Sequence, residues 1–125
     1  MTGLPEPADR LDQIFALQRR FQEDLLRRRG LQDIDEMEWV QKAAMALMVE
    51  LGEVLEEARY EWWKRNPPVE AAKLHEELVD VFHFFVTMCL AAGMDAEDLY
   101  RGYLAKQAEN VRRQDGTADR PDYRA

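Results

Sequence analysis

Apolar residues recur at helical spacing in four long segments, and glycine, proline and aspartate separate these segments. In the first segment the apolar positions share one face, and three arginines occupy the last turn, where the helix dipole favours cations. Pro67 and Pro68 end the second segment, Gly93 ends the third, and Asp95 is placed to cap the fourth. The four expected helices cover residues 8–29, 35–64, 69–92 and 95–113.

These segments predict an all-α protein, because no stretch alternates apolar and polar residues with the period of two that a strand requires. Short connections make neighbouring helices antiparallel, so we expect a four-helix antiparallel bundle in a single domain over residues 1–125. Its core is expected over about 9–113, followed by a polar tail over 114–125. Residues 43–49 and 79–90 are apolar around most of the helix circumference and need cover on several sides. We therefore expect a homodimer or a homotetramer.

Composition and charge narrow the range of partners. The 125 residues carry a formal net charge of −8, which disfavours nucleic acid, because phosphate binding requires a basic surface. Cys89 is the only cysteine, which excludes an intrachain disulfide and a zinc site built from several thiolates. The sequence shows no apolar signal core and no apolar run long enough to span a membrane. We expect a cytoplasmic protein that binds neither nucleic acid nor membrane.

Four acidic residues carry the main functional signal, because they interrupt apolar helix faces. Glu50 and Glu53 point in the direction of apolar positions of the second helix, and Glu77 and Asp80 do so in the third. An unpaired buried carboxylate costs several kcal/mol, so each of them requires a partner or a metal. Residues three apart are neighbours on a helix, so the four acids make two adjacent pairs.

If the second and third helices pack antiparallel, the two pairs face each other and form an oxygen-rich site suited to Mg²⁺ or Mn²⁺. Three alternatives stay open. In the first, the acids are solvated and bind no metal. In the second, Glu76 replaces Glu77 as the ligand, because a spacing of four residues from Asp80 serves as well as a spacing of three. Asp80 and His83 also suggest a di-iron centre, although such centres need a Glu-x-x-His on each of two helices.

Other polar residues stand at conspicuous positions. Gln18 lies in the apolar stripe of the first helix, where its amide either bonds a neighbouring backbone group or reads the edge of a nucleobase. His83 lies between two phenylalanines, a position where a lone histidine is usually structural. Trp62 and Trp63 end the expected second helix, where one ring packs and the other is free to stack on a second ring.

Lys106, Asn110 and Arg113 form a single stripe on the fourth helix. Such a stripe is either a solvated basic face or, opposite a metal site, a set of groups for a polyphosphate and its sugar or base.

The chain resembles the all-α nucleoside triphosphate pyrophosphohydrolases, the superfamily of the MazG-type enzymes and the dimeric dUTPases. The resemblance covers about residues 11–116 and rests on three motifs: Glu50-Leu51-Gly52-Glu53, Glu77-Leu78-Val79-Asp80, and Lys106, Asn110 and Arg113-Gln114. The surroundings of Asp80 and His83 are closest to the dimeric dUTPases, and the short connection over 93–100 is similar to MazG-type chains.

The resemblance implies a helical dimer or tetramer that hydrolyses dUTP to dUMP and pyrophosphate. It implies that Glu50, Glu53, Glu77 and Asp80 hold Mg²⁺, with Mn²⁺ as a substitute, and that Glu50 accepts the proton of the attacking water. The implied substrate-binding residues are Gln18, Trp63, His83, Lys106, Asn110 and Arg113, of which Gln18 reads uracil, Lys106 and Arg113 bind phosphate, and Asn110 binds the sugar or base.

Two competing hypotheses remain at this point. A MazG-like house-cleaning enzyme would keep the chemistry and act on another nucleoside triphosphate or on many of them. A non-enzymatic helical oligomerisation module would pair the same acids with basic side chains such as Arg59 or Lys73.

Overall fold

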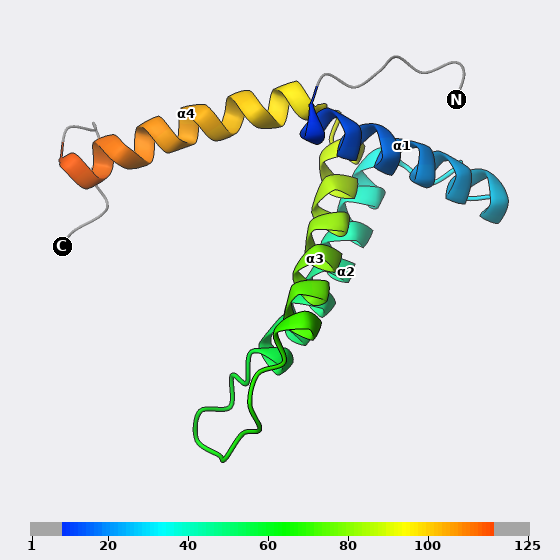
Figure 1. The fold of residues 1–125 in the computed structure, drawn as a ribbon. Coiled ribbons are helices and arrows are strands. Elements are labelled where there is room, and N and C mark those ends of the chain that lie inside the picture. Colours follow the sequence, from blue (N-terminus) through cyan, green and yellow to red (C-terminus); the bar gives the residue numbers. More distant parts are fainter. Residues whose placement is uncertain (1–8, 117–125) are drawn as a thin grey trace. The chain divides into compact units, whose positions relative to one another are not determined.

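The computed structural model describes residues 9–116, and these contain four α-helices and no strand (Figure 1). The helices are α1 (Arg10–Arg29), α2 (Glu36–Glu57), α3 (Ala71–Ala91) and α4 (Ala96–Asp115). The predicted all-α class is confirmed. Ala8, the predicted start of the first helix, and residues 117–125 of the predicted tail lie outside the described residues.

Several helix ends follow the local chemistry of the sequence. The Asp9 carboxylate accepts a hydrogen bond of 2.9 Å from the backbone N–H of Asp12, and α1 ends at Gly30, whose φ of 64° suits glycine. Asp95 and Asp98 form a reciprocal capping box at the start of α4, with bonds of 2.8 and 3.0 Å.

The second helix is shorter than predicted and ends at Glu57 rather than near Lys64. The backbone N–H of Tyr60 donates to the carbonyl of Leu55 over 3.1 Å, which closes the helix in a Schellman motif. Arg59 occupies the left-handed position of this motif with a φ of 57°, a conformation that usually selects glycine. Pro67 and Pro68 set only the latest point at which the helix must end. The Schellman motif ends α2 before that point.

A loop over residues 58–70 replaces the expected short turn between α2 and α3. The Arg59 guanidinium donates to the carbonyl of Pro68 over 3.2 Å and therefore joins the two ends of the loop. Trp62 and Trp63 lie in this loop instead of ending the second helix, and their side chains are 84% and 61% exposed. The two rings meet edge to face, with centroids 5.8 Å apart.

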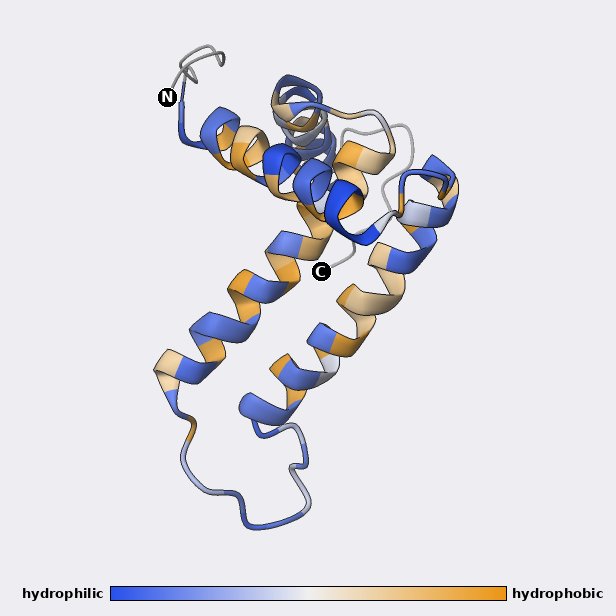
Figure 2. Cartoon of the chain, turned by 90° about the vertical axis from the view of Figure 1, so that its right-hand side faces the viewer, coloured by the Kyte–Doolittle hydropathy of each residue, from blue (hydrophilic) through white to orange (hydrophobic). Residues whose placement is uncertain are grey.

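The described residues form two compact units, and each is considered by itself. The first contains α1, α2 and α3. Figures 1 and 2 show α2 and α3 running antiparallel beside each other, with α1 packed on α3. Phe15 of α1, Ala43 of α2, and Val86 and Cys89 of α3 are buried. The second unit contains α4, and the prediction of a single domain stays a prediction.

Many large apolar side chains of the first unit are exposed. Figure 2 shows apolar residues interspersed with polar ones along α2 and α3. Met48 and Val49 of α2 are 69% and 65% exposed, and Val79 of α3 is 55% exposed. Homo-oligomerisation, which would cover such residues, stays a prediction. Within residues 9–116, no single helix is long and apolar enough to cross a membrane, and only α3 and α4 taken together as a broken pair reach that length and hydropathy.

Candidate functional site

Three of the four predicted acidic ligands meet between α2 and α3. Glu50 and Glu53 come from the last turns of α2, and Glu77 comes from the second turn of α3, which runs in the opposite direction. One carboxylate oxygen of each lies within 4.8 Å of the others. Asp80 stands outside this cluster and lines the adjoining pocket together with Glu50. The structure therefore brings three of the four predicted acids together.

The cluster lacks the donors that three carboxylates need. Oε2 of Glu50 and Oε2 of Glu77 are buried, and no hydrogen-bond donor within residues 9–116 reaches them. A hydrogen bond between the Glu77 and Glu53 carboxyls, partial burial, and the charges of Glu53 and Glu50 raise the pKa of Glu77 to about 7. Only a proton or a cation satisfies such a set of oxygens, and the all-oxygen donor set fits a hard divalent ion.

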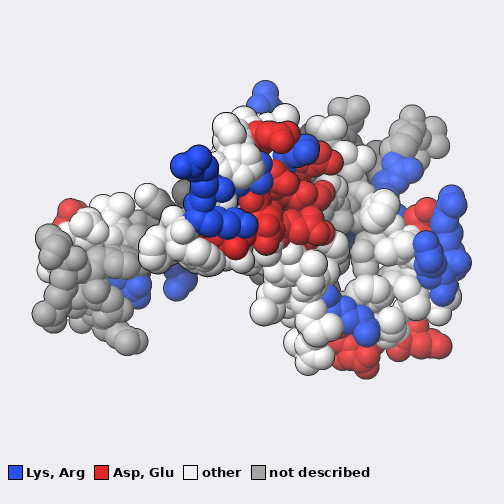
Figure 3. Space-filling view, turned by 90° about the horizontal axis from the view of Figure 1, so that it is seen from below, with Lys and Arg blue, Asp and Glu red and all other residues white. Residues whose placement is uncertain are grey.

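Acidic side chains are concentrated on part of the surface. Seen from below, acidic side chains gather in one patch, with Lys and Arg side chains at its margin (Figure 3). Glu57 adds a further buried oxygen without a donor among the described side chains. The local charge therefore attracts cations and repels an anionic substrate unless cations are bound first.

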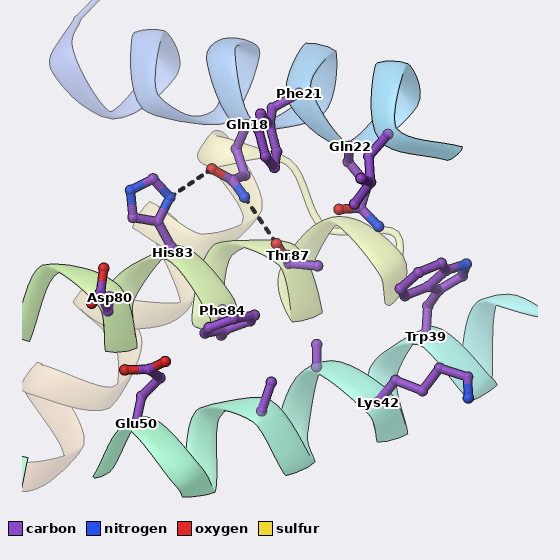
Figure 4. A pocket seen from close by; sticks show the side chains of 13 residues that line it. Gln18, Phe21, Gln22, Trp39, Lys42, Glu50, Asp80, His83, Phe84 and Thr87 are labelled. Atoms are coloured by element: carbon purple, nitrogen blue, oxygen red, sulfur yellow. Dashed lines mark hydrogen bonds between the residues drawn. The ribbon is translucent and has the colours of Figure 1, made fainter. Parts of the chain in front are cut away.

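A cavity of about 470 Å³ opens next to the cluster, between α1, α2 and α3 (Figure 4). Glu50 and Asp80 lie at one end of the cavity, and Trp39 and Lys42 lie at the other. Six of its thirteen lining residues are aromatic or aliphatic. The complete lining is Gln18, Phe21, Gln22, Leu25, Trp39, Lys42, Ala43, Ala46, Glu50, Asp80, His83, Phe84 and Thr87.

Gln18 is held by two polar partners on α3. Its Nε2 donates to Oγ1 of Thr87 over 3.0 Å, and its Oε1 lies 3.0 Å from Nδ1 of His83 (Figure 4). The sequence also allowed a backbone group as the partner of this amide, but the structure shows two side-chain partners instead. An amide fixed at both ends keeps one N–H and one oxygen lone pair for a third group, and the cavity provides the space for one.

One predicted site residue of the first unit, Trp63, lies in the loop over 58–70 and is not part of the lining. Lys106, Asn110 and Arg113 lie on α4 in the second unit, where Lys106 is exposed and the other two are half-buried. Nε of Arg113 lies 3.3 Å from Oε1 of Glu109, and a hydrogen bond from Arg112, together with the charges of Arg112 and Arg113, holds the pKa of Glu109 below its ordinary value.

Some residues that line the cavity were not identified as site residues from the sequence. Thr87 is buried and contacts Gln18, and its signal was its position seven residues after Asp80, on the same helix face. Phe84 and Trp39 had no signal beyond helical periodicity, which also describes ordinary core residues. Nε1 of Trp39 is buried without a hydrogen-bond acceptor in the described part of the chain.

Comparison with known proteins supports the resemblance noted in the sequence. The model of the dUTPase family matches residues 10–92, which contain α1, α2 and α3. A dCTP pyrophosphatase of Enterobacteria phage LZ5 is 37% identical over 65 residues, covering 43% of this chain and 38% of the phage protein. A dCTP pyrophosphatase of Enterobacteria phage T4 is 40% identical over 48 residues, covering 38% of this chain and 28% of that protein. The matches thus span well under half of these curated relatives, and no solved structure matches the chain significantly.

Proposed function

Because the chain belongs to the dUTPase family of all-α nucleoside triphosphate pyrophosphohydrolases, we propose that it hydrolyses dUTP to dUMP and pyrophosphate with the help of Mg²⁺. One observation carries the proposal: a single cavity joins an amide held for recognition at Gln18 to carboxylates at Glu50 and Asp80. A nucleotide has the same two ends, a base with donors and acceptors and a charged phosphate chain.

The base end of the cavity suits a pyrimidine ring. Phe84 and Phe21 provide flat apolar surface, and Gln18 offers a donor and an acceptor to the ring edge. Gln18 belongs to α1 and its two partners to α3, so the recognition group depends on the packing of α1 on α3.

The carboxylate end suits the triphosphate once cations are present. Glu50, Glu53, Glu77 and Asp80 would hold Mg²⁺ or Mn²⁺, which would neutralise phosphate charge and lower the pKa of the attacking water. Glu50 belongs to both the cluster and the cavity lining, so we assign it the role of accepting the proton of that water. Lys106 and Arg113 are proposed to bind phosphate oxygens and Asn110 the sugar or base, as the family resemblance implies.

A second substrate is favoured by the curated relatives, both of which are named dCTP pyrophosphatase. Hydrolysis of dCTP uses the same phosphate chemistry and differs only at the base. A MazG-like enzyme with a broad preference would instead accept purine nucleotides as well.

We further propose that the protein works as a homo-oligomer. Met45, Met48 and Val49 expose apolar surface on α2, and Leu78 and Val79 do so on α3. A second copy of the chain would cover these residues. Light scattering after size exclusion should give the mass of a dimer or a tetramer, and a monomeric mass would overturn this proposal.

The proposed activity is tested by measuring pyrophosphate release from dUTP, dCTP, dTTP, dATP, dGTP and UTP with Mg²⁺. Glu53→Gln should abolish release while the helical content is retained, because one cation ligand is lost. Glu56→Gln is the matched control, since this exposed acid lies one turn further along α2 outside the cluster. Release from dUTP by the wild type and the control alone supports the proposal. No release from any nucleotide with Mg²⁺ or Mn²⁺ would favour a helical oligomerisation module.

A further inference from the structure

The two partners of Gln18 share a chemical property that the proposed function does not use. The hydroxyl of Thr87 both donates and accepts hydrogen bonds, and the imidazole of a neutral His83 carries its proton on either Nδ1 or Nε2. Each end of the Gln18 amide is therefore bound by a group that can either donate or accept a hydrogen bond.

The orientation of the amide in the structure implies one arrangement of the protons. Oε1 of Gln18 only accepts, so Nδ1 of His83 carries a proton and donates to it over 3.0 Å. Nε2 of Gln18 only donates, so Oγ1 of Thr87 accepts over 3.0 Å. If the amide turns by half a rotation, Nε2 donates to an unprotonated Nδ1 and the Thr87 hydroxyl donates to Oε1. Both orientations keep two hydrogen bonds and the same total charge.

Uracil and cytosine require these opposite orientations. Uracil presents a donor at N3 and an acceptor at O4, whereas cytosine presents an acceptor at N3 and a donor at its amino group. An amide that pairs with one of these edges meets the other with donor facing donor and acceptor facing acceptor. The half rotation exchanges its oxygen and nitrogen and restores the match.

We propose that the Gln18 amide inverts between His83 and Thr87, so that this site accepts both dUTP and dCTP. The inference rests on the proposed pyrophosphohydrolase function and adds the breadth of its substrate class. Thr87 and His83 act as positioning residues, because they set the direction of the amide. Thr87 is buried, with 7% of its surface exposed, and His83 is exposed, so position 83 is the better place for substitutions.

Substitutions at position 83 fix the amide in one direction or the other. His83→Lys supplies only donors and holds Oε1 of Gln18 toward position 83, whereas His83→Glu supplies only acceptors and holds Nε2 there. His83→Gln is the matched control, because its own amide offers both polarities. The quantity measured is the ratio of kcat/KM for dUTP to kcat/KM for dCTP, in which a change of local charge cancels.

We expect a wild-type ratio within about tenfold of unity, a similar ratio for His83→Gln, and shifts of about tenfold or more in opposite directions for His83→Lys and His83→Glu. A wild-type preference beyond tenfold, or shifts of both variants in the same direction, would overturn the inversion. Absence of pyrophosphate release from both nucleotides would refute the proposed function itself. Release from one nucleotide alone refutes the inversion and leaves the function standing.

A second readout needs no turnover. The chain has two histidines, so the ¹⁵N resonances of His83 are assigned against those of His75. Binding of dUMP and of dCMP should place the imidazole proton on different nitrogens of His83, while His75 is unchanged. The same tautomer of His83 with both nucleotides would contradict the inversion.

Discussion

Gln18 of α1 donates its side-chain N–H to Oγ1 of Thr87 of α3, a residue 69 positions further along the chain, over 3.0 Å. This bond joins the helix that supplies the proposed base-reading amide to the helix that supplies two of the proposed cation ligands. The proposed binding of the base and the docking of α1 on α3 are therefore linked through the Gln18 side chain.

Thr87→Val removes this contact and nearly preserves the side-chain shape. We expect the free energy of unfolding to fall by about 1–2 kcal/mol, because the part-buried amide loses one partner. We also expect a higher KM with a smaller change in kcat, since the proposed cation ligands are untouched. Denaturant unfolding and steady-state kinetics measure the two effects. Thr87→Ser keeps the hydroxyl and should stay close to the wild type, and equal losses in both variants would mean that the methyl group is what matters.

Glu77 gives the metal-free protein a defined pH dependence. Its pKa of about 7 lies above the ordinary 4.5, so the folded state holds a proton that the unfolded chain releases between these values. This stabilisation is complete below pH 4.5 and is lost as the pH rises through 7. With a chelator present, Glu77→Gln should lose less stability than the wild type between pH 5 and 8, as followed by thermal unfolding.

The matched control for this experiment is Glu76→Gln, because Glu76 is exposed and adjacent on the same helix. It should keep the pH dependence of the wild type. If Glu76→Gln flattens the curve and Glu77→Gln does not, Glu76 is the acid that belongs to the cluster.

A divalent cation should stabilise the folded protein, because the cluster of Glu50, Glu53 and Glu77 forms only when α2 and α3 pack. At a concentration of Mg²⁺ near a hundred times its Kd, the expected gain is about 2.7 kcal/mol. Calorimetry should show a rise of the melting temperature in the wild type and in Glu56→Gln. Glu50→Gln should show a much smaller rise, and an equal rise would place the cation elsewhere.

Arg59 provides a test of the loop that follows α2. Arg59→Ala keeps an unfavourable left-handed conformation and loses the hydrogen bond to the Pro68 carbonyl. Arg59→Gly also loses that bond but relieves the backbone. We expect the glycine variant to be more stable than the alanine variant by about 1 kcal/mol in urea unfolding. Equal stabilities would show that the left-handed conformation carries no cost at this position.

Much of the fold and the acidic cluster could be predicted because both depend on local periodicity. The cap at Asp95 follows from local sequence, and the meeting of Glu50 with Glu77 needs only a helical repeat and an antiparallel neighbour. The end of α2 could not be predicted, because a closing motif centred on Arg59 uses a residue type that rarely adopts a left-handed conformation.

The recognition part of the site was harder to predict than the acidic part. Gln18 was conspicuous as an amide in an apolar stripe. Its partners, however, depend on how α1 crosses α3, and residue spacing within one helix carries no information about that crossing. Thr87 is a small residue on an apolar helix, and only the tertiary contact distinguishes it from its neighbours.

The residues that α3 contributes follow one another at helical intervals: Glu77, Asp80, His83 and Thr87. At a rise of 1.5 Å per residue, the first and last lie about 15 Å apart along the axis. An insertion of one residue between Asp80 and His83 would turn the proposed base-reading residues by about 100° away from the proposed cation ligands. During evolution, α3 should therefore change by substitution alone, whereas the loop over 58–70 is free to vary in length.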